Sequence, residues 1–277
     1  MPFTPSHAVV ALPFIRTPLV PAAIAVGAMT PDLPLFVRGL PLAYGITHSF
    51  AWLPVTMAAA FALLLLWRCV VRPAARELSP RWIAERLPGE WDAGASASFG
   101  ETLAGRPGAR RSVIGVLLLV ASLAIGVVSH IVWDLFTHEG RWGSSVLPGL
   151  AASWGPLPGY KWLQHGSSAL GLAILGAFML VWLIRRRVAA SAARVLPRGI
   201  RAAWWLSLPI VLVVAWGAGF AAFGPFDDAF TPAHLAYRVL PPACATWGAL
   251  TVALCVAVQV LRARSSREGS AGVSREA

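Results

Sequence analysis

The chain alternates between long apolar runs and short polar connections, and five of the runs are long enough to cross a membrane. These runs cover residues 50–71, 112–136, 166–184, 203–223 and 243–261. A helix of about 20 apolar residues spans the ~30 Å hydrocarbon core of a bilayer. Backbone groups in lipid must bond within their own segment, so such runs form helices. The pattern predicts an all-α fold, a polytopic transmembrane helical bundle with five full spans.

A further apolar stretch, residues 8–29, has a different pattern. It contains Pro13, Pro18 and Pro21, and Arg16 lies between the first two. Prolines break helices, and an arginine at mid-bilayer depth is costly. Two interpretations stay open from these features: two short helices that form a re-entrant or interfacial hairpin, or a kinked sixth span. A signal peptide is not expected, because the stretch lacks a basic start and a small-residue cleavage site.

Composition excludes a water-soluble protein. Of the 277 residues, 57% are hydrophobic and 13% are charged, whereas soluble domains carry about 25% charged residues. A disordered chain, a coiled coil and a disulfide-stapled secreted module would also be more polar. Tryptophan collects at membrane interfaces, so the thirteen tryptophans of the chain are typical of a membrane protein. Composition therefore supports an integral membrane protein.

The distribution of arginine predicts the orientation of the spans. Residues 72–111 carry seven arginines, 185–202 carry six and 262–277 carry four, which is 17 of the 23 basic residues. Cytoplasmic connections are enriched in Lys and Arg, so these segments and the C-terminus are expected in the cytoplasm. The net charge of +11 then reflects topology, and no nucleic-acid partner is expected. The 72–111 connection is expected to be a solvated, partly flexible loop.

The six histidines lie outside the arginine-rich segments, and five of them lie near the predicted outer ends of spans: His48, His130, His138, His165 and His234. The side of His7 depends on the path of residues 8–29. Three acidic residues lie beside them, namely Asp32, Asp134 and Glu139. Ionisable groups at membrane depth are costly, so these residues are candidates for a functional site.

The most specific local pattern is the pair His130 and Asp134. Residues four apart project from one face of a helix, and this is the spacing at which two side chains chelate one metal ion. Imidazole with carboxylate suits zinc or manganese. His138 lies about 12 Å from His130 along a regular helix, which is too far for one ion. Either the helix breaks before His138, or His138 serves a second ion.

Each of these residues also has an ordinary structural interpretation. His130 and Asp134 could form an interfacial pair, and His48 and His165 could be bystanders near helix ends. Asp32 lies between Pro31 and Pro34 with one residue intervening, where it could be a turn residue. The metal hypothesis gains weight because these residues are expected on one membrane face.

Several segments resemble a bacterial membrane family, domain-of-unknown-function family 4184. The segments are Met1-Pro2-Phe3-Thr4-Pro5-Ser6-His7-Ala8, Pro31-Asp32, Thr47-His48-Ser49, Ser129-His130-xxx-Asp134 and Thr137-His138-Glu139-Gly140-Arg141-Trp142. The resemblance covers roughly residues 1–185. The chain is therefore expected to contain a membrane domain 1–185 with the metal site and, from its apolar runs, two further transmembrane helices in 186–261. The Ser, Arg and Gly composition of residues 262–277 predicts a disordered cytoplasmic tail. The resemblance to a bacterial membrane family implies that this multi-pass protein lies in the bacterial inner membrane.

The family is similar in turn to membrane-bound metal-dependent hydrolases and, more distantly, to zinc-dependent phospholipase C and the P1-type nucleases. This similarity implies metal ligands at His7, Asp32, His48, His130, Asp134, His138 and His165. Pro31-Asp32 is followed by Leu33-Pro34, so the second acid and the histidine of the hydrolase motif are absent. One or two zinc or manganese ions are therefore expected. If the ligands share one site, His7 must return to the outer face, which favours the hairpin.

The resulting functional hypothesis is a metal-dependent hydrolase at the outer membrane face. Its substrate would be a phosphoester or a lipid-linked ester, with Asp32 or Glu139 as general base and membrane lipid as the partner. Arg141 could stabilise an anionic transition state or anchor the chain at the interface. The alternative is a non-enzymatic transporter or assembly factor with a structural metal or none. Catalytic zinc keeps an open coordination position and structural zinc does not.

Overall fold

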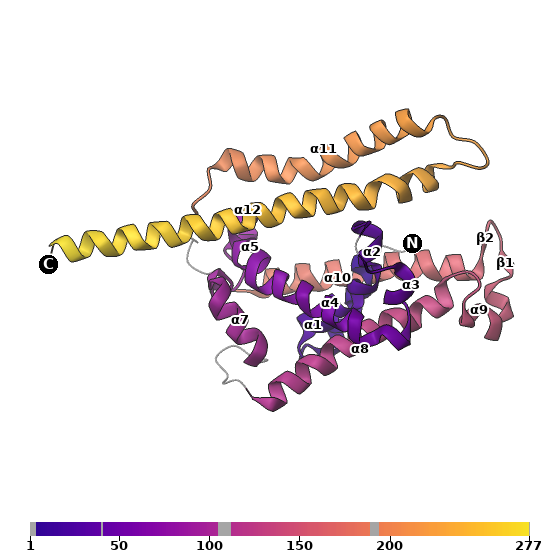
Figure 1. Ribbon diagram of the computed structural model, residues 1–277, viewed down its shortest axis with the longest axis horizontal. Helices are drawn as coiled ribbons and strands as arrows, with labels where there is room; N and C mark the ends of the chain where they lie inside the picture. The colour runs from indigo at the N-terminus through magenta and orange to yellow at the C-terminus, as the bar shows by residue number, and fades with distance from the viewer. Residues whose placement is uncertain (1–3, 40, 105–111, 189–193, 277) are drawn as a thin grey trace. The chain divides into compact units, whose positions relative to one another are not determined.

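The computed structural model describes residues 4–39, 41–104, 112–188 and 194–276, and side chains as far as 265 (Figure 1). Across these residues all elements are helical except a two-stranded hairpin, β1 (Ser153–Trp154) and β2 (Leu157–Pro158). Five helical segments are long and apolar enough to cross a membrane: Phe50–Leu78, Val113–Thr137, Gly159–Arg185, Arg198–Phe223 and Pro232–Ser265. They contain the five predicted runs almost entirely, so the all-α class of a membrane protein is confirmed.

The elements follow one another in this order. The first half contains η1 (Thr4–Phe14), α1 (Pro21–Met29), η2 (Thr30–Asp32), α2 (Leu33–Phe36), α3 (Tyr44–Thr47), η3 (Phe50–Trp52), α4 (Leu53–Leu66), η4 (Trp67–Val71), α5 (Arg72–Leu78), α6 (Arg81–Ala84), η5 (Gly89–Asp92) and α7 (Ala95–Ala104). The second half contains α8 (Val113–Thr137), α9 (Trp142–Val146), η6 (Pro148–Leu150), the hairpin, α10 (Gly159–Arg185), α11 (Arg198–Phe223) and α12 (Pro232–Glu276).

The chain divides into two compact units. The first consists of Met1–Pro34, Leu40–Leu66 and Phe99–Arg186, and the second of Leu35–Gly39, Trp67–Ser98 and Arg187–Ala277. The first unit contains α1, α4, α8 and α10, with the short N-terminal helices packed among them (Figure 1). The division into 1–185, 186–261 and a disordered tail stays a prediction.

Helices α1 and α8 touch through their backbones because glycine faces glycine. A Cβ atom added to Gly27 would lie 2.7 Å from the Leu123 carbonyl oxygen. One added to Gly126 would overlap the Ile24 carbonyl oxygen and lie 2.8 Å from the Ala28 nitrogen. Such small residues permit the close helix packing that is common in membranes. The contact brings the next turn of α8 against the end of α1.

Residues 8–29 leave one end of the first unit and return to it. Ser6, at the start of η1, packs against Gly171 of α10. Arg16, beyond the end of η1, shares a pocket with Trp182 and Arg185 of α10. Because α10 rises about 1.5 Å per residue, these positions are roughly 20 Å apart along it. The chain then reverses, and α1 leads back to Asp32, whose carboxylate accepts a hydrogen bond from Thr4 of η1 at 2.7 Å.

In the second unit, α11 and α12 lie side by side and antiparallel (Figure 1). Trp204 Nε1 donates to Thr251 Oγ1 at 3.0 Å, and Trp247 Nε1 donates to Ser207 Oγ at 2.8 Å. These bonds satisfy polar groups inside two apolar helices, where an unpaired group is costly. The core beside them consists of Ala74, Leu78, Leu196, Cys255 and Val258.

The segment expected as a solvated loop instead contains a buried carboxylate. The fully buried Glu77 accepts from the backbone nitrogens of Val195 and Leu196, both at 3.1 Å. Its oxygens also lie 3.5 Å from the guanidinium groups of Arg201 and Arg262. Residues 72–104 therefore fold into short helices, while 105–111 lie outside the described residues. The expectation failed because the partners of Glu77 are more than 100 residues away.

Replacing Gly126 with alanine tests the close contact between α1 and α8. The added methyl group must displace backbone, and overpacking of this kind costs about 1–3 kcal/mol. Gly176→Ala is the matched control, because a Cβ there meets nothing within 4 Å and alanine favours helix. Thermal unfolding in detergent should show a lower midpoint for Gly126→Ala only. Equal midpoints in the two variants would contradict the packing described.

Replacing Glu77 with glutamine tests the buried ion network. The amide keeps the shape but removes the charge that faces Arg201 and Arg262, and its NH₂ group opposes other donors. Leaving such groups unsatisfied costs about 1–3 kcal/mol. Glu90→Gln, at an exposed position, is the control. Denaturant unfolding should detect the loss in Glu77→Gln, and a stability equal to the Glu90→Gln variant would refute the role of Glu77.

Candidate metal centre

Six of the seven residues proposed as metal ligands meet in the first unit. They come from separate segments: His7 from η1, Asp32 from η2, His48 from the end of α3, His130 and Asp134 from α8, and His138 directly after α8. His130 is completely buried, and Asp32, Asp134 and His48 are each less than one-tenth exposed. A cluster of ionisable groups this far from water requires compensation by neighbouring charge.

Four atoms form the centre of the cluster. His48 Nε2 lies 3.2 Å from His130 Nε2 and 3.3 Å from Asp134 Oδ2. His130 Nε2 lies 3.6 Å from Asp134 Oδ2 and 3.7 Å from Asp32 Oδ1. Asp32 Oδ1 is 3.9 Å from His48 Nε2. Two imidazole nitrogens and two carboxylate oxygens therefore face one another across a small space.

His7 and His138 extend the cluster beyond these four atoms. The His7 ring stacks on the His130 ring, with centroids 4.1 Å apart. His7, His130 and Asp134 offer ligand atoms that all lie within 4.8 Å of one another. Helix α8 ends at Thr137, and His138 is extended with φ −124° and ψ 145°. This break brings His138 Nδ1 to 3.5 Å from Asp134 Oδ2, as the first of the two sequence alternatives requires.

Backbone carbonyl groups orient the two central imidazoles. His130 Nδ1 lies 2.7 Å from the Ala28 carbonyl oxygen, and His48 Nδ1 lies 3.0 Å from the Tyr44 carbonyl oxygen. A carbonyl oxygen only accepts, so both Nδ1 atoms carry the proton. In the neutral imidazole each Nε2 then presents a lone pair to the cluster. Partners of this kind commonly hold metal-binding histidines.

Three polar residues that the sequence did not single out complete the surroundings. Thr4 Oγ1 donates to Asp32 Oδ2 at 2.7 Å. Tyr44 OH donates to Asp134 Oδ2 at 3.4 Å, and burial together with the charge of Asp134 raises the pKa of Tyr44. The fully buried Gln164 contacts His138 Nε2 at 3.1 Å through its amide nitrogen. Burial lowers the pKa of His138, which favours its neutral form.

Two proposed residues lie elsewhere among those the structure describes. His165 is exposed, because a step of one residue along α10 turns it away from the side where Gln164 faces His138. Glu139 is also exposed, one residue beyond His138. Neither belongs to the groups whose ligand atoms converge. Thr4 lies in the segment 1–8 that carries His7, and Gln164 directly precedes His165; this proximity to a histidine is the only signal that the sequence offered for them.

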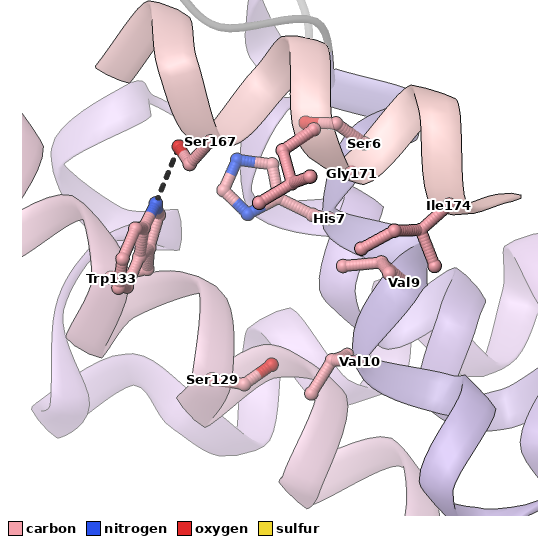
Figure 2. Close-up of a pocket in the computed structure, with 10 residues that line it drawn as sticks. Ser6, His7, Val9, Val10, Ser129, Trp133, Ser167, Gly171 and Ile174 are labelled. Atoms are coloured by element: carbon pink, nitrogen blue, oxygen red, sulfur yellow. Dashed lines mark hydrogen bonds between the residues drawn. The ribbon is translucent and has the colours of Figure 1, made fainter. Parts of the chain in front are cut away.

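A pocket of about 360 Å³ reaches the cluster at His7 (Figure 2). It lies between η1, α8 and α10, and its lining is mostly apolar with a few hydroxyl groups. Trp133 Nε1 donates to Ser167 Oγ at 3.2 Å across one side. The complete lining is Ser6, His7, Val9, Val10, Ser129, Trp133, Ser167, Leu170, Gly171 and Ile174.

The fold and the site together define a helical membrane protein with a buried cluster of histidine and aspartate. The sequence profile of the family described as Domain of unknown function (DUF4184) matches residues 1–258. The chain belongs to this family. The match confirms the resemblance and extends it beyond residue 185, to include most of the last two apolar helices. No curated protein and no solved structure matches the chain, so the similarity to hydrolases stays an expectation.

Proposed function

We propose that the cluster binds one or two divalent ions, zinc or manganese, and that the chain hydrolyses a phosphoester or related ester at the outer face of the bacterial inner membrane. The observation that carries the proposal is the convergence of His48, His130, Asp32 and Asp134. Their four inner atoms are all acceptors when the imidazoles are neutral, and the hydrogen bond that Tyr44 donates to one of them, Asp134 Oδ2, is long at 3.4 Å. A cation placed among them removes the repulsion.

The distances between these atoms fit an ion of ordinary size. Zinc binds nitrogen and oxygen ligands at about 2.0–2.2 Å, so tetrahedral ligand atoms lie roughly 3.3–3.6 Å apart. Five of the six distances among the four atoms range from 3.2 to 3.9 Å, close to that spacing. Without a metal, one Nε2 would have to carry a proton and donate it to the other at 3.2 Å, and protonating both would bring two cationic N–H groups to that distance. A divalent ion avoids both arrangements, which supports the proposed metal site.

A second ion has ligands available in the outer part of the cluster. Asp134 Oδ1 and His7 Nε2 are buried and have no hydrogen-bond partner in the part of the chain that the structure describes. Buried polar atoms usually have partners, and an exception calls for an explanation such as an ion or water. His138 Nδ1 lies 3.5 Å from Asp134 Oδ2, and His7 and Asp134 offer ligand atoms within 4.8 Å of each other. This supports the expectation of one or two ions.

The chain's own residues supply the setting for hydrolysis. A bound divalent ion would contribute Lewis acidity, which polarises an ester oxygen and makes water more acidic. Thr4 holds the Asp32 carboxylate toward the imidazoles, so Asp32 acts as a ligand in this proposal. Tyr44 stays protonated and donates toward Asp134. Arg141 is half-buried and its charge reaches Tyr44, which suits it to an anionic substrate.

The proposal includes a topology. Five crossings with the arginine-rich segments inside place His48, His130 and His138 at the outer face. His7 and Asp32 flank residues 8–29 and meet in the same cluster. A single crossing of ~30 Å by these residues would separate them. The meeting of His7 and Asp32 therefore supports a re-entrant hairpin with the N-terminus outside, in which Arg16 lies near the cytoplasmic end of α10.

Metal content measured by mass spectrometry on detergent-purified protein tests this proposal. Wild type is compared with His130→Ala and with Asp134→Asn, which keeps the shape of the side chain. His165→Ala is the matched control, because His165 is exposed and outside the cluster. Wild type and control should hold one or two zinc or manganese ions per chain. Both cluster variants should lose them while eluting as folded monodisperse protein.

Hydrolysis of phosphodiester and phospholipid probes by the same four proteins then tests the enzymatic part. The metal-bearing proteins should be active, and a chelator should abolish the activity. Protein purified without chelators that contains no stoichiometric metal would contradict the site. Metal lost from the cluster variants without any hydrolysis in wild type would favour the non-enzymatic alternative, in which a metal clamps the helices together.

A further inference from the structure

The pocket of Figure 2 is lined along one side by α10, a helix long and apolar enough to span a membrane. Leu170 and Ile174 of α10 line it and are 63% and 42% exposed. Ile174 lies 15 residues from the first residue of α10 and 11 from the last, which is about 22 Å and 16 Å along the helix. In the topology proposed above, an exposed side chain near the middle of this span would face hydrocarbon, and the pocket would open toward lipid.

The chemistry of the lining changes along the pocket. Val9, Val10, Leu170 and Ile174 are apolar, and the first two are half-buried on η1. At the other end lies His7, whose Nε2 is buried and has no partner among the described residues. Figure 2 shows the His7 ring between Ser167 and the apolar side chains of Val9 and Ile174. An occupant needs a hydrocarbon part and a polar group next to it.

The polar end of the pocket adjoins the candidate metal centre. The His7 ring lines the pocket and also stacks on His130 at 4.1 Å. A polar group held at His7 would lie next to the ion proposed there. The volume of about 360 Å³ falls at the small end of ligand pockets, and at ~30 Å³ for each group the size of a water molecule it holds roughly twelve. That is enough for a segment of about twelve carbons of one acyl chain.

We propose that this pocket binds one acyl chain of a membrane phospholipid and that this lipid is the substrate. The chain enters sideways from the bilayer past Leu170 and Ile174, and the ester or phosphoester group lies at His7. The inference rests on the proposed function and deepens it by naming the substrate class. It also explains why an apolar wall and a cluster of ionisable groups adjoin each other at His7.

Photocrosslinking in vesicles tests the pocket. The full chain is reconstituted in phosphatidylethanolamine and phosphatidylglycerol with a trace of phosphatidylglycerol that carries a diazirine in the middle of one acyl chain. Adducts are mapped by peptide mass spectrometry. Val9 and Val10 should be labelled although they are half-buried, as heavily as the exposed positions of α10.

Two tryptophan variants on α10 separate the pocket from the lipid-facing surface. Ile174→Trp fills the pocket and should reduce labelling of Val9 and Val10 by about tenfold, a change of ~1.4 kcal/mol. Leu172→Trp, on the same helix and outside the lining, should leave it unchanged. Metal content should be retained in both variants, while phospholipid hydrolysis should fall only in Ile174→Trp.

The outcomes separate this inference from the proposed function. Absent labelling of Val9 and Val10, or equal labelling in both variants, overturns the lipid pocket while metal content still supports the centre. Labelling of the pocket in a protein without metal overturns the assignment of that lipid as a substrate and refutes the metal centre itself. A third outcome also overturns the substrate class. In it, wild type hydrolyses water-soluble phosphodiesters but no phospholipid, and Ile174→Trp does not change that activity.

Discussion

The hydrogen bond between His130 Nδ1 and the Ala28 carbonyl oxygen, 2.7 Å long, determines the geometry of the site. It forms because Gly27 and Gly126 let α1 and α8 touch through their backbones, and His130 lies one turn beyond Gly126. The bond turns Nε2 of a completely buried imidazole toward Asp32, His48 and Asp134. A bulkier residue at either glycine would separate the helices and move the imidazole away from its partners. The close packing of Gly27 and Gly126 thus determines where the His130 imidazole lies, one helical turn away.

The same constraint decides what the cluster can hold. Since both central imidazoles give their Nδ1 protons to carbonyl groups, they face the carboxylates with lone pairs. Burial raises the cost of leaving such groups uncompensated, because the surroundings screen charge weakly. A divalent ion bound there, as proposed, would compensate all four at once. The pocket adds a second property, since the imidazole of His7 belongs both to its wall and to the edge of the cluster, so that a lipid and an ion could meet there.

Sequence alone predicted the five long apolar helices and most of the cluster, because both depend on local signals. Runs of about 20 apolar residues identify spans without knowledge of their partners, and ionisable residues near membrane ends are rare enough to single out His130 and Asp134. Side-chain direction was harder to predict. Choosing Gln164 instead of His165 requires knowing which side of α10 faces α8. The buried Glu77 was missed because its partners at Val195 and Arg262 are distant in sequence, and the register of Gly27 against Gly126 is equally non-local.

The central claim is tested most directly by extended X-ray absorption fine structure, measured above the absorption edge of the bound metal in detergent-purified protein. The account predicts a shell of nitrogen and oxygen atoms at about 2.0–2.2 Å, with the outer scattering of imidazole rings and no sulfur. The chain has three cysteines, Cys69, Cys244 and Cys255, which would give sulfur at about 2.3 Å if they held the metal instead. A sulfur shell, or a first shell of oxygen without imidazole, would contradict the assignment of the metal to His48, His130, Asp32 and Asp134.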